Sequence, residues 1–174
     1  MKKTVIFTLL SMLLCTILLA GCGSDEPTAE QKKEEMDKAF LAFAAQITRF
    51  QELSTKVGST FENVGEKKIN AGQAKEQYES ISAAYLEVAA NLKKIGTPQW
   101  LSSENKAKFD EMKKHYVEAT EAMSSYAKIL VKCPDSKCST EDRKKIIEYS
   151  SIRKEGLTKG AALMTYFADG NWKK

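Results

Sequence analysis

The single histidine is the residue with the most scope for metal chemistry in this 174-residue sequence. His115 follows Glu111 by four residues and precedes Glu118 by three, so on a helix the three side chains share one face. Imidazole and carboxylate groups can bind a metal ion weakly at this spacing, but a mixed acidic and histidine face exposed to water is far commoner. We therefore expect no metal site and no cofactor.

One motif in the sequence is associated with nucleophilic catalysis, the Ser-x-x-Lys of penicillin-binding proteins. It occurs three times, beginning at Ser103, Ser125 and Ser151. The Ser-Asp-Asn and Lys-Thr-Gly motifs that complete such a site do not occur in the sequence. Since a catalytic site needs a nucleophile, a base and a group that orients the base, we expect this protein not to be an enzyme.

The amino-terminal sequence carries the most specific signal in the chain. Two lysines at positions 2 and 3 precede an apolar run over residues 5–20, which ends in Leu19-Ala20-Gly21-Cys22. This run is shorter than the roughly 20 apolar residues that span a bilayer, and a small-residue cleavage site follows it, as in a secretory signal. The motif resembles the lipobox of bacterial lipoproteins.

The lipobox resemblance implies three things about the mature protein. Residues 1–21 are a signal peptide that is removed, Cys22 carries a diacylglycerol, and the chain is held on the extracytoplasmic side of a cell membrane. In a cell with two membranes, this is the inner or the outer one. The membrane is thus the first expected partner, through the lipid on Cys22.

Two cysteines are left for structural bonding once Cys15 departs with the signal and Cys22 is lipidated. Cys133 and Cys138 flank a Pro-Asp-Ser-Lys turn, and disulfides persist outside the cytoplasm. We predict that they are bonded to each other and fix this turn. A redox or metal role is less favoured, because the spacing is not Cys-x-x-Cys and no second ligand pair accompanies it.

The charge of the mature chain is nearly balanced. The sequence has 27 lysines and arginines against 23 acidic residues, and removal of two lysines with the signal leaves 25 against 23, a balance of +2. Arginine occurs only at positions 49, 143 and 153, and the lysines are interleaved with glutamates. Nucleic-acid binding needs a concentrated basic patch, so we do not expect nucleic acid as a partner.

Helix signals recur along the rest of the chain. Polar residues suited to cap a helix stand before four stretches whose apolar residues recur at steps of three and four. The caps are Thr28, Asn70, Ser102 or Ser103, and Ser139 or Thr140. The small and polar residues 22–28 form a tether, and residues 29–174 form the domain. The predicted apolar stripes include Phe61 in the first helix and Ala161 in the last.

These signals predict an all-α fold, an antiparallel four-helix bundle with up-down-up-down topology. Short connections place successive helices side by side, and no alternating strand pattern competes. The first helix is expected to continue to about Gly65 with a kink allowed at Gly58. If it breaks at Gly58, a three-helix bundle is the alternative. Gly156 and Gly160 form a Gly-x-x-x-Gly pair, which favours close packing of the last helix.

The predicted topology sorts residues between the two ends of the bundle. The tether, the connection between the second and third helices, and the carboxyl terminus share one end, which therefore holds Trp100 and Trp172. Lysines at positions 93, 94, 173 and 174 accompany them. Tryptophan with lysine suits the headgroup region of a membrane, whereas the alternative is that the indoles only plug the end of the bundle. The opposite end carries the cysteine turn and residues 66–72.

Two function classes follow from these observations. The first is a surface-tethered, non-catalytic interaction module that binds another protein of the cell envelope, since rigid helical faces are good docking surfaces. The second is a sensor or carrier of a small ligand held in a pocket between helices. Arg153 interrupts the stripe of the last helix at a position close to the core, so it is the candidate ligand contact.

Overall fold

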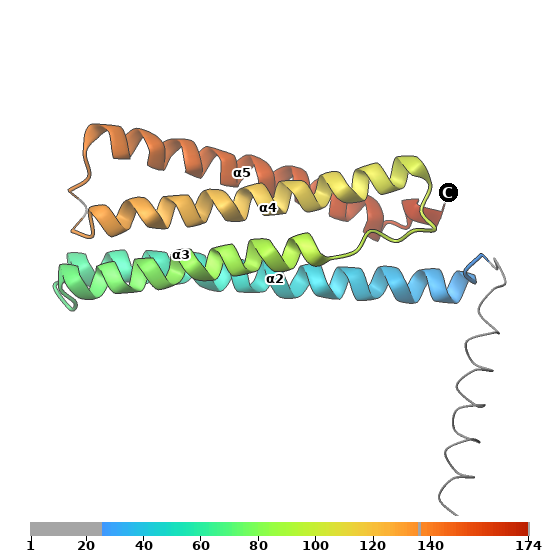
Figure 1. Cartoon of the computed structure of the whole chain (residues 1–174), viewed down its shortest axis with the longest axis horizontal. Coiled ribbons are helices and arrows are strands. Elements are labelled where there is room, and N and C mark those ends of the chain that lie inside the picture. The colour runs from blue at the N-terminus through green and yellow to red at the C-terminus, as the bar shows by residue number, and fades with distance from the viewer. Residues whose placement is uncertain (1–25, 136, 174) are drawn as a thin grey trace, which may run out of the picture.

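Four long helices make up the part of the chain that this computed structural model describes, residues 26–135 and 137–173. They are α2 (Ala29–Gly65), α3 (Ala71–Lys94), α4 (Ser103–Lys132) and α5 (Thr140–Ala168), followed by the short 3₁₀ helix η1 (Asn171–Lys173). Successive helices run antiparallel and side by side (Figure 1). The four-helix bundle is therefore confirmed. The predicted signal peptide 1–21, the predicted lipidation site Cys22 and residues 23–25 of the tether lie outside the described residues.

Local capping determines where the helices begin. The side chain of each cap accepts a hydrogen bond from the backbone N–H three residues later, which satisfies one of the free donors of the first turn. The caps are Thr28, Asn70, Ser102 and Ser139. Thr28 and Asn70 form full capping boxes, in which the glutamine side chain three residues later accepts a bond from the backbone of the cap.

The first helix does not break at Gly58. α2 continues as a single helix to Gly65, so the three-helix alternative is wrong. Hydrogen bonds along the helix and buried residues on both sides of the glycine, among them Leu53 and Thr60, outweigh the backbone freedom of one residue. Phe61, predicted to continue the apolar stripe, is instead 48% exposed. The core side of α2 near its end is occupied by Val57 and Thr60.

The core is formed by α2, α3 and α4, and the predicted stripes of α3 and α4 are buried almost throughout. Aromatic side chains fill much of it. The ring of Phe109 packs edge to face against both Phe43 and Phe167, with ring centroids 5.7 Å apart in each pair. Such aromatic pairs add to the free energy of burial. They join α2, α4 and α5 across the bundle.

The last helix packs through small residues. The buried positions of α5 are Gly156, Gly160 and Phe167, while Ala161, predicted to lie in the core, is exposed. The two glycines place the backbone of α5 directly against α4. The face of α5 that contacts α4 is therefore centred on Gly156 and Gly160, and Ala161 lies outside it. The predicted close packing at the Gly-x-x-x-Gly pair is confirmed.

The two ends of the bundle carry different groups. We call the base the end at which α2 begins, α3 connects to α4, and α5 and η1 terminate (Figure 1). We call the tip the opposite end, with the α2–α3 and α4–α5 connections. Within the described residues, no helix is both long and apolar enough to cross a membrane.

Candidate functional site

The base contains an open cleft of about 850 Å³. It lies where the start of α2, the α3–α4 connection and η1 meet. Its lining includes Glu26, Lys32, Trp100, Ser102, Trp172 and Lys173. Glu26, which lines this cleft, stands four residues after Cys22 in the sequence.

The two tryptophans of the protein form one wall of this base cleft. Their ring centroids are 5.4 Å apart in an edge-to-face arrangement, and both side chains are half-buried. The indole N–H of Trp100 donates to a carboxylate oxygen of Glu35 at 2.5 Å. The ammonium groups of Lys32 and Lys173 lie 5.8 Å and 5.2 Å from the ring centroids of Trp100 and Trp172. The rings are therefore held by contacts on their edges and faces.

The charges around the base cleft largely neutralise one another. Lys32 pairs with Glu26 at 2.5 Å, and Lys33 pairs with Asp37 at 2.7 Å. The hydrogen bond that Lys32 donates holds the pKa of the Glu26 carboxyl below its ordinary value, and the hydrogen bond that Lys33 donates to Asp37 raises the pKa of Lys33. Glu30 adds a further negative charge to the lining. The cleft thus combines an apolar aromatic wall with paired charges.

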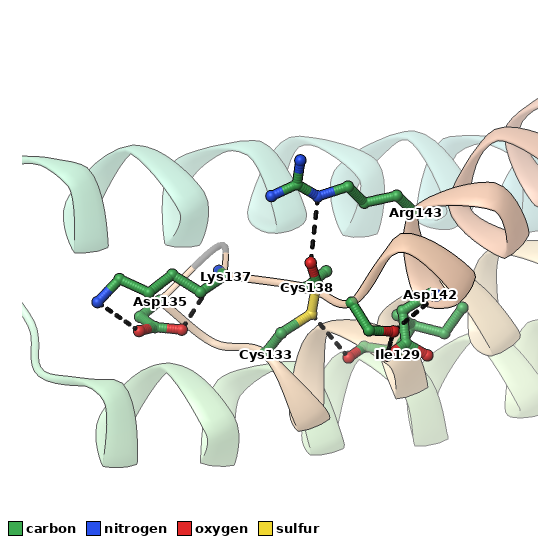
Figure 2. The surroundings of a disulfide bond; sticks show 8 residues. Ile129, Cys133, Asp135, Lys137, Cys138, Asp142 and Arg143 are labelled. Carbon is green, nitrogen blue, oxygen red and sulfur yellow. Dashed lines mark hydrogen bonds and ion pairs between the residues drawn. A yellow bond between two sulfur atoms is a disulfide. The ribbon is translucent and has the colours of Figure 1, made fainter.

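The predicted cysteine pair lies at the tip. Cys133 and Cys138 form a disulfide with Cα atoms 5.0 Å apart, and both are buried (Figure 2). Ser139 caps α5 directly after it, and the Arg143 side chain donates through Nε to the carbonyl oxygen of Cys138 at 3.1 Å. The disulfide therefore links the end of α4 to the cap of α5 and fixes the turn between them.

The histidine cluster lies on α4, where the His115 side chain is mostly buried and the Glu111 side chain is exposed. The ring nitrogens Nε2 and Nδ1 of His115 lie 3.5 Å and 3.7 Å from carboxylate oxygens of Glu111 and Glu118, respectively. No group of three or more His, Cys, Asp or Glu side chains among residues 26–135 and 137–173 is arranged to hold a metal ion. The backbone of His115 contributes to helix packing, because its carbonyl oxygen lies against Gly156 of α5.

Arg153 is half-buried on α5, on the side of Tyr85, whose hydroxyl lies 3.0 Å from the Ser54 hydroxyl. The space between helices beside Leu157, one turn further along α5, measures about 10 Å³. This is about the room that one water molecule needs, so this space cannot hold a metabolite. The structure does not bring Arg153 to the base cleft.

A second open site lies on the outer face of α3 and α4. It is a groove of about 250 Å³ lined by Glu79, Ser82, Ala83, Leu86, Lys128 and Val131. Leu86 is 45% exposed there, although it is a large apolar residue. The sequence patterns missed this groove, and they also missed Glu35 as the partner of Trp100, because both depend on how helices far apart in sequence are placed.

The described residues thus form an all-α bundle whose surface includes the base cleft and the groove between α3 and α4. Searches of protein-family models, of curated proteins and of solved structures find no match to this chain.

Proposed function

We propose that the protein is an extracytoplasmic lipoprotein, anchored through lipid on Cys22, whose bundle is a non-catalytic module that binds another protein of the cell envelope. The lipobox resemblance supports the anchor. Arrival of the chain at the base supports a bundle that extends away from the membrane, since α4 alone, with 30 residues, is about 45 Å long. The side faces of the helices and the tip are then the surfaces that a partner can reach.

The groove between α3 and α4 is the main support for the proposed binding function. Ala83 and Leu86 of α3 and Val131 of α4 give it an apolar lining, and Glu79 and Lys128 add one charge of each sign. An amphipathic helix recognises such a groove by placing apolar residues in it and pairing charges along its edges. The groove therefore suits a helical segment of an envelope protein.

The two helices that form the groove are held rigidly to each other. The hydroxyl oxygens of Ser82 and Ser124 lie 2.9 Å apart, and each also lies within hydrogen-bonding distance of the other residue's carbonyl oxygen. Both side chains are buried. A groove that is already formed loses little conformational entropy when a partner binds, which favours affinity.

Site-specific crosslinking in the cells that make the protein tests this function. Ala83, exposed in the groove, is replaced by a photo-crosslinking amino acid, and Ala44, exposed on α2, serves as the matched control. We expect one adduct from position 83, identified by mass spectrometry as an envelope protein, and none from position 44. The adduct should disappear with Leu86→Lys and with Cys22→Ala.

Absence of any specific adduct at position 83, in protein that is folded and membrane-bound, would contradict the interaction function. An adduct that survives Leu86→Lys would place the partner outside the groove. A protein that stays soluble with an intact Cys22 would contradict the lipid anchor.

A further inference from the structure

The base cleft lies at the point where a lipid anchor would hold the protein. Four residues separate Cys22 from Glu26, which lines the cleft. At full extension, four residues reach about 14 Å at most. This is less than half the length of α4, so the proposed anchor brings the base, and not the tip, to the bilayer surface.

We propose that the base cleft is a membrane-docking surface in which Trp100 and Trp172 enter the headgroup region of the bilayer. This inference rests on the proposed anchor at Cys22. The tryptophan rings then contact the interface between lipid headgroups and acyl chains. The bundle then stands on the membrane through two contacts, the lipid and the indole rings.

The indole rings have the properties that this interface selects. An indole is apolar over most of its surface and has one polar N–H, which is why tryptophan gathers at the boundary between headgroups and hydrocarbon. The two rings are half-buried and lie edge to face, so they present a joint apolar surface. Lys173, which is exposed and lies near the ring of Trp172, carries a long apolar chain that can extend along the interface with its ammonium group in water.

The paired charges of the base predict how docking depends on lipid composition. Among the lining residues, Lys32, Lys33 and Lys173 face Glu26 and Glu30, and the first two lysines already pair with carboxylates. A surface with such a balance gains little from anionic lipids, which attract clusters of unpaired basic residues. Docking is thus driven by the aromatic rings, and it occurs on zwitterionic bilayers.

Tryptophan fluorescence reports on this surface alone, because the protein has two tryptophans and both line the base cleft. The lipidated protein is reconstituted into phosphatidylcholine vesicles whose acyl chains are brominated near the headgroup. We expect the emission to fall roughly twofold relative to vesicles without bromine, because the rings lie within the interface. Adding anionic lipid or raising the salt concentration should change this quenching little.

Variants assign the effect to the rings. Trp100→Phe and Trp172→Phe leave one indole each, and both single-tryptophan proteins should be quenched. Ile147→Ala changes a large apolar residue on α5 that is 69% exposed and lies near the tip, and it should leave the quenching unchanged.

The outcomes separate the docking inference from the proposed anchor. A protein that floats with the vesicles but shows no quenching keeps its anchor, and the docking inference is overturned. Quenching that appears only with anionic lipid would overturn docking through the rings in favour of electrostatic attraction. A protein with intact Cys22 that does not float with the vesicles overturns the anchor itself.

Discussion

Gly156 lies so close to the backbone of α4 that a Cβ atom on it would come within 2.6 Å of the carbonyl oxygen of His115. A Cβ at Gly160 would likewise come within 2.9 Å of the ring of Tyr116. Real Cβ atoms do not approach other atoms this closely, so the absence of side chains at these two positions sets the distance between α4 and α5. The Gly-x-x-x-Gly pair is therefore a packing device.

Gly156→Ala should separate α5 from α4 and lower the free energy of unfolding by about 1–3 kcal/mol, the range for overpacking a close contact. Gly58→Ala is the matched control. It also lies within a helix, but a Cβ atom on it would meet nothing within 4 Å, so alanine should raise stability by about 0.5–1 kcal/mol. Urea unfolding measures both. Equal effects at the two positions would contradict the packing role of Gly156.

The buried hydroxyl pair of Ser82 and Ser124 should show energetic coupling between α3 and α4. Either single change to alanine leaves the other hydroxyl with fewer partners in the core and should lower stability by about 1–2 kcal/mol. The double variant should lose less than the sum of the two. A double-mutant cycle by urea unfolding measures the difference. Ser80→Ala, exposed on α3, should change little, and strict additivity of the buried pair would contradict direct bonding.

Tyr78 and Tyr85 form a natural comparison of buried hydroxyl groups. The Tyr78 side chain is buried and its hydroxyl has no hydrogen-bond partner among the described residues, whereas the Tyr85 hydroxyl meets Ser54 at 3.0 Å. An unsatisfied buried hydroxyl costs stability, so Tyr78→Phe should raise the free energy of unfolding by about 1 kcal/mol. Tyr85→Phe should lower it by a similar amount. Destabilisation by Tyr78→Phe would show that the hydroxyl has a partner.

Titration of Tyr78 should weaken the fold at high pH. Burial raises the pKa of its phenol from 10.0 to about 12. The unfolded chain therefore loses this proton first, and the neutral folded form is fully favoured below pH 10 and progressively less as the pH rises to 12. Unfolding measured against pH should show a smaller fall for Tyr78→Phe than for the unmodified protein across that range. Parallel curves would contradict the shift.

The disulfide at the tip should contribute modestly to stability. It closes a loop between Cys133 and Cys138 with a sequence separation of 5, for which loop entropy predicts about 2 kcal/mol. Replacing both cysteines by serine should lower the free energy of unfolding by that amount. A reducing agent should have the same effect on the unmodified protein and none on the variant. Unchanged stability on reduction would show that the turn is fixed by its hydrogen bonds.

The helices themselves were predictable because their signals are local. A cap such as Thr28 or Asn70 bonds to a backbone N–H three residues later, so both partners stand together in the sequence. The stripes of α3 and α4 repeat at steps that follow from helix geometry. The Gly-x-x-x-Gly pair also indicated a close contact. Phe61 and Ala161 departed from prediction, because burial at a stripe's edge depends on the neighbouring helix.

The sequence by itself determined the all-α bundle and the starts of its helices, since capping and periodicity act over short stretches of chain. Only the tertiary structure decided that α2 passes Gly58 unbroken, that Trp100 bonds Glu35 and meets Trp172, and that Leu86 borders an open groove. These relationships join residues far apart in the chain. Their geometry follows from how closely the helices pack, which no local pattern of residue types encodes.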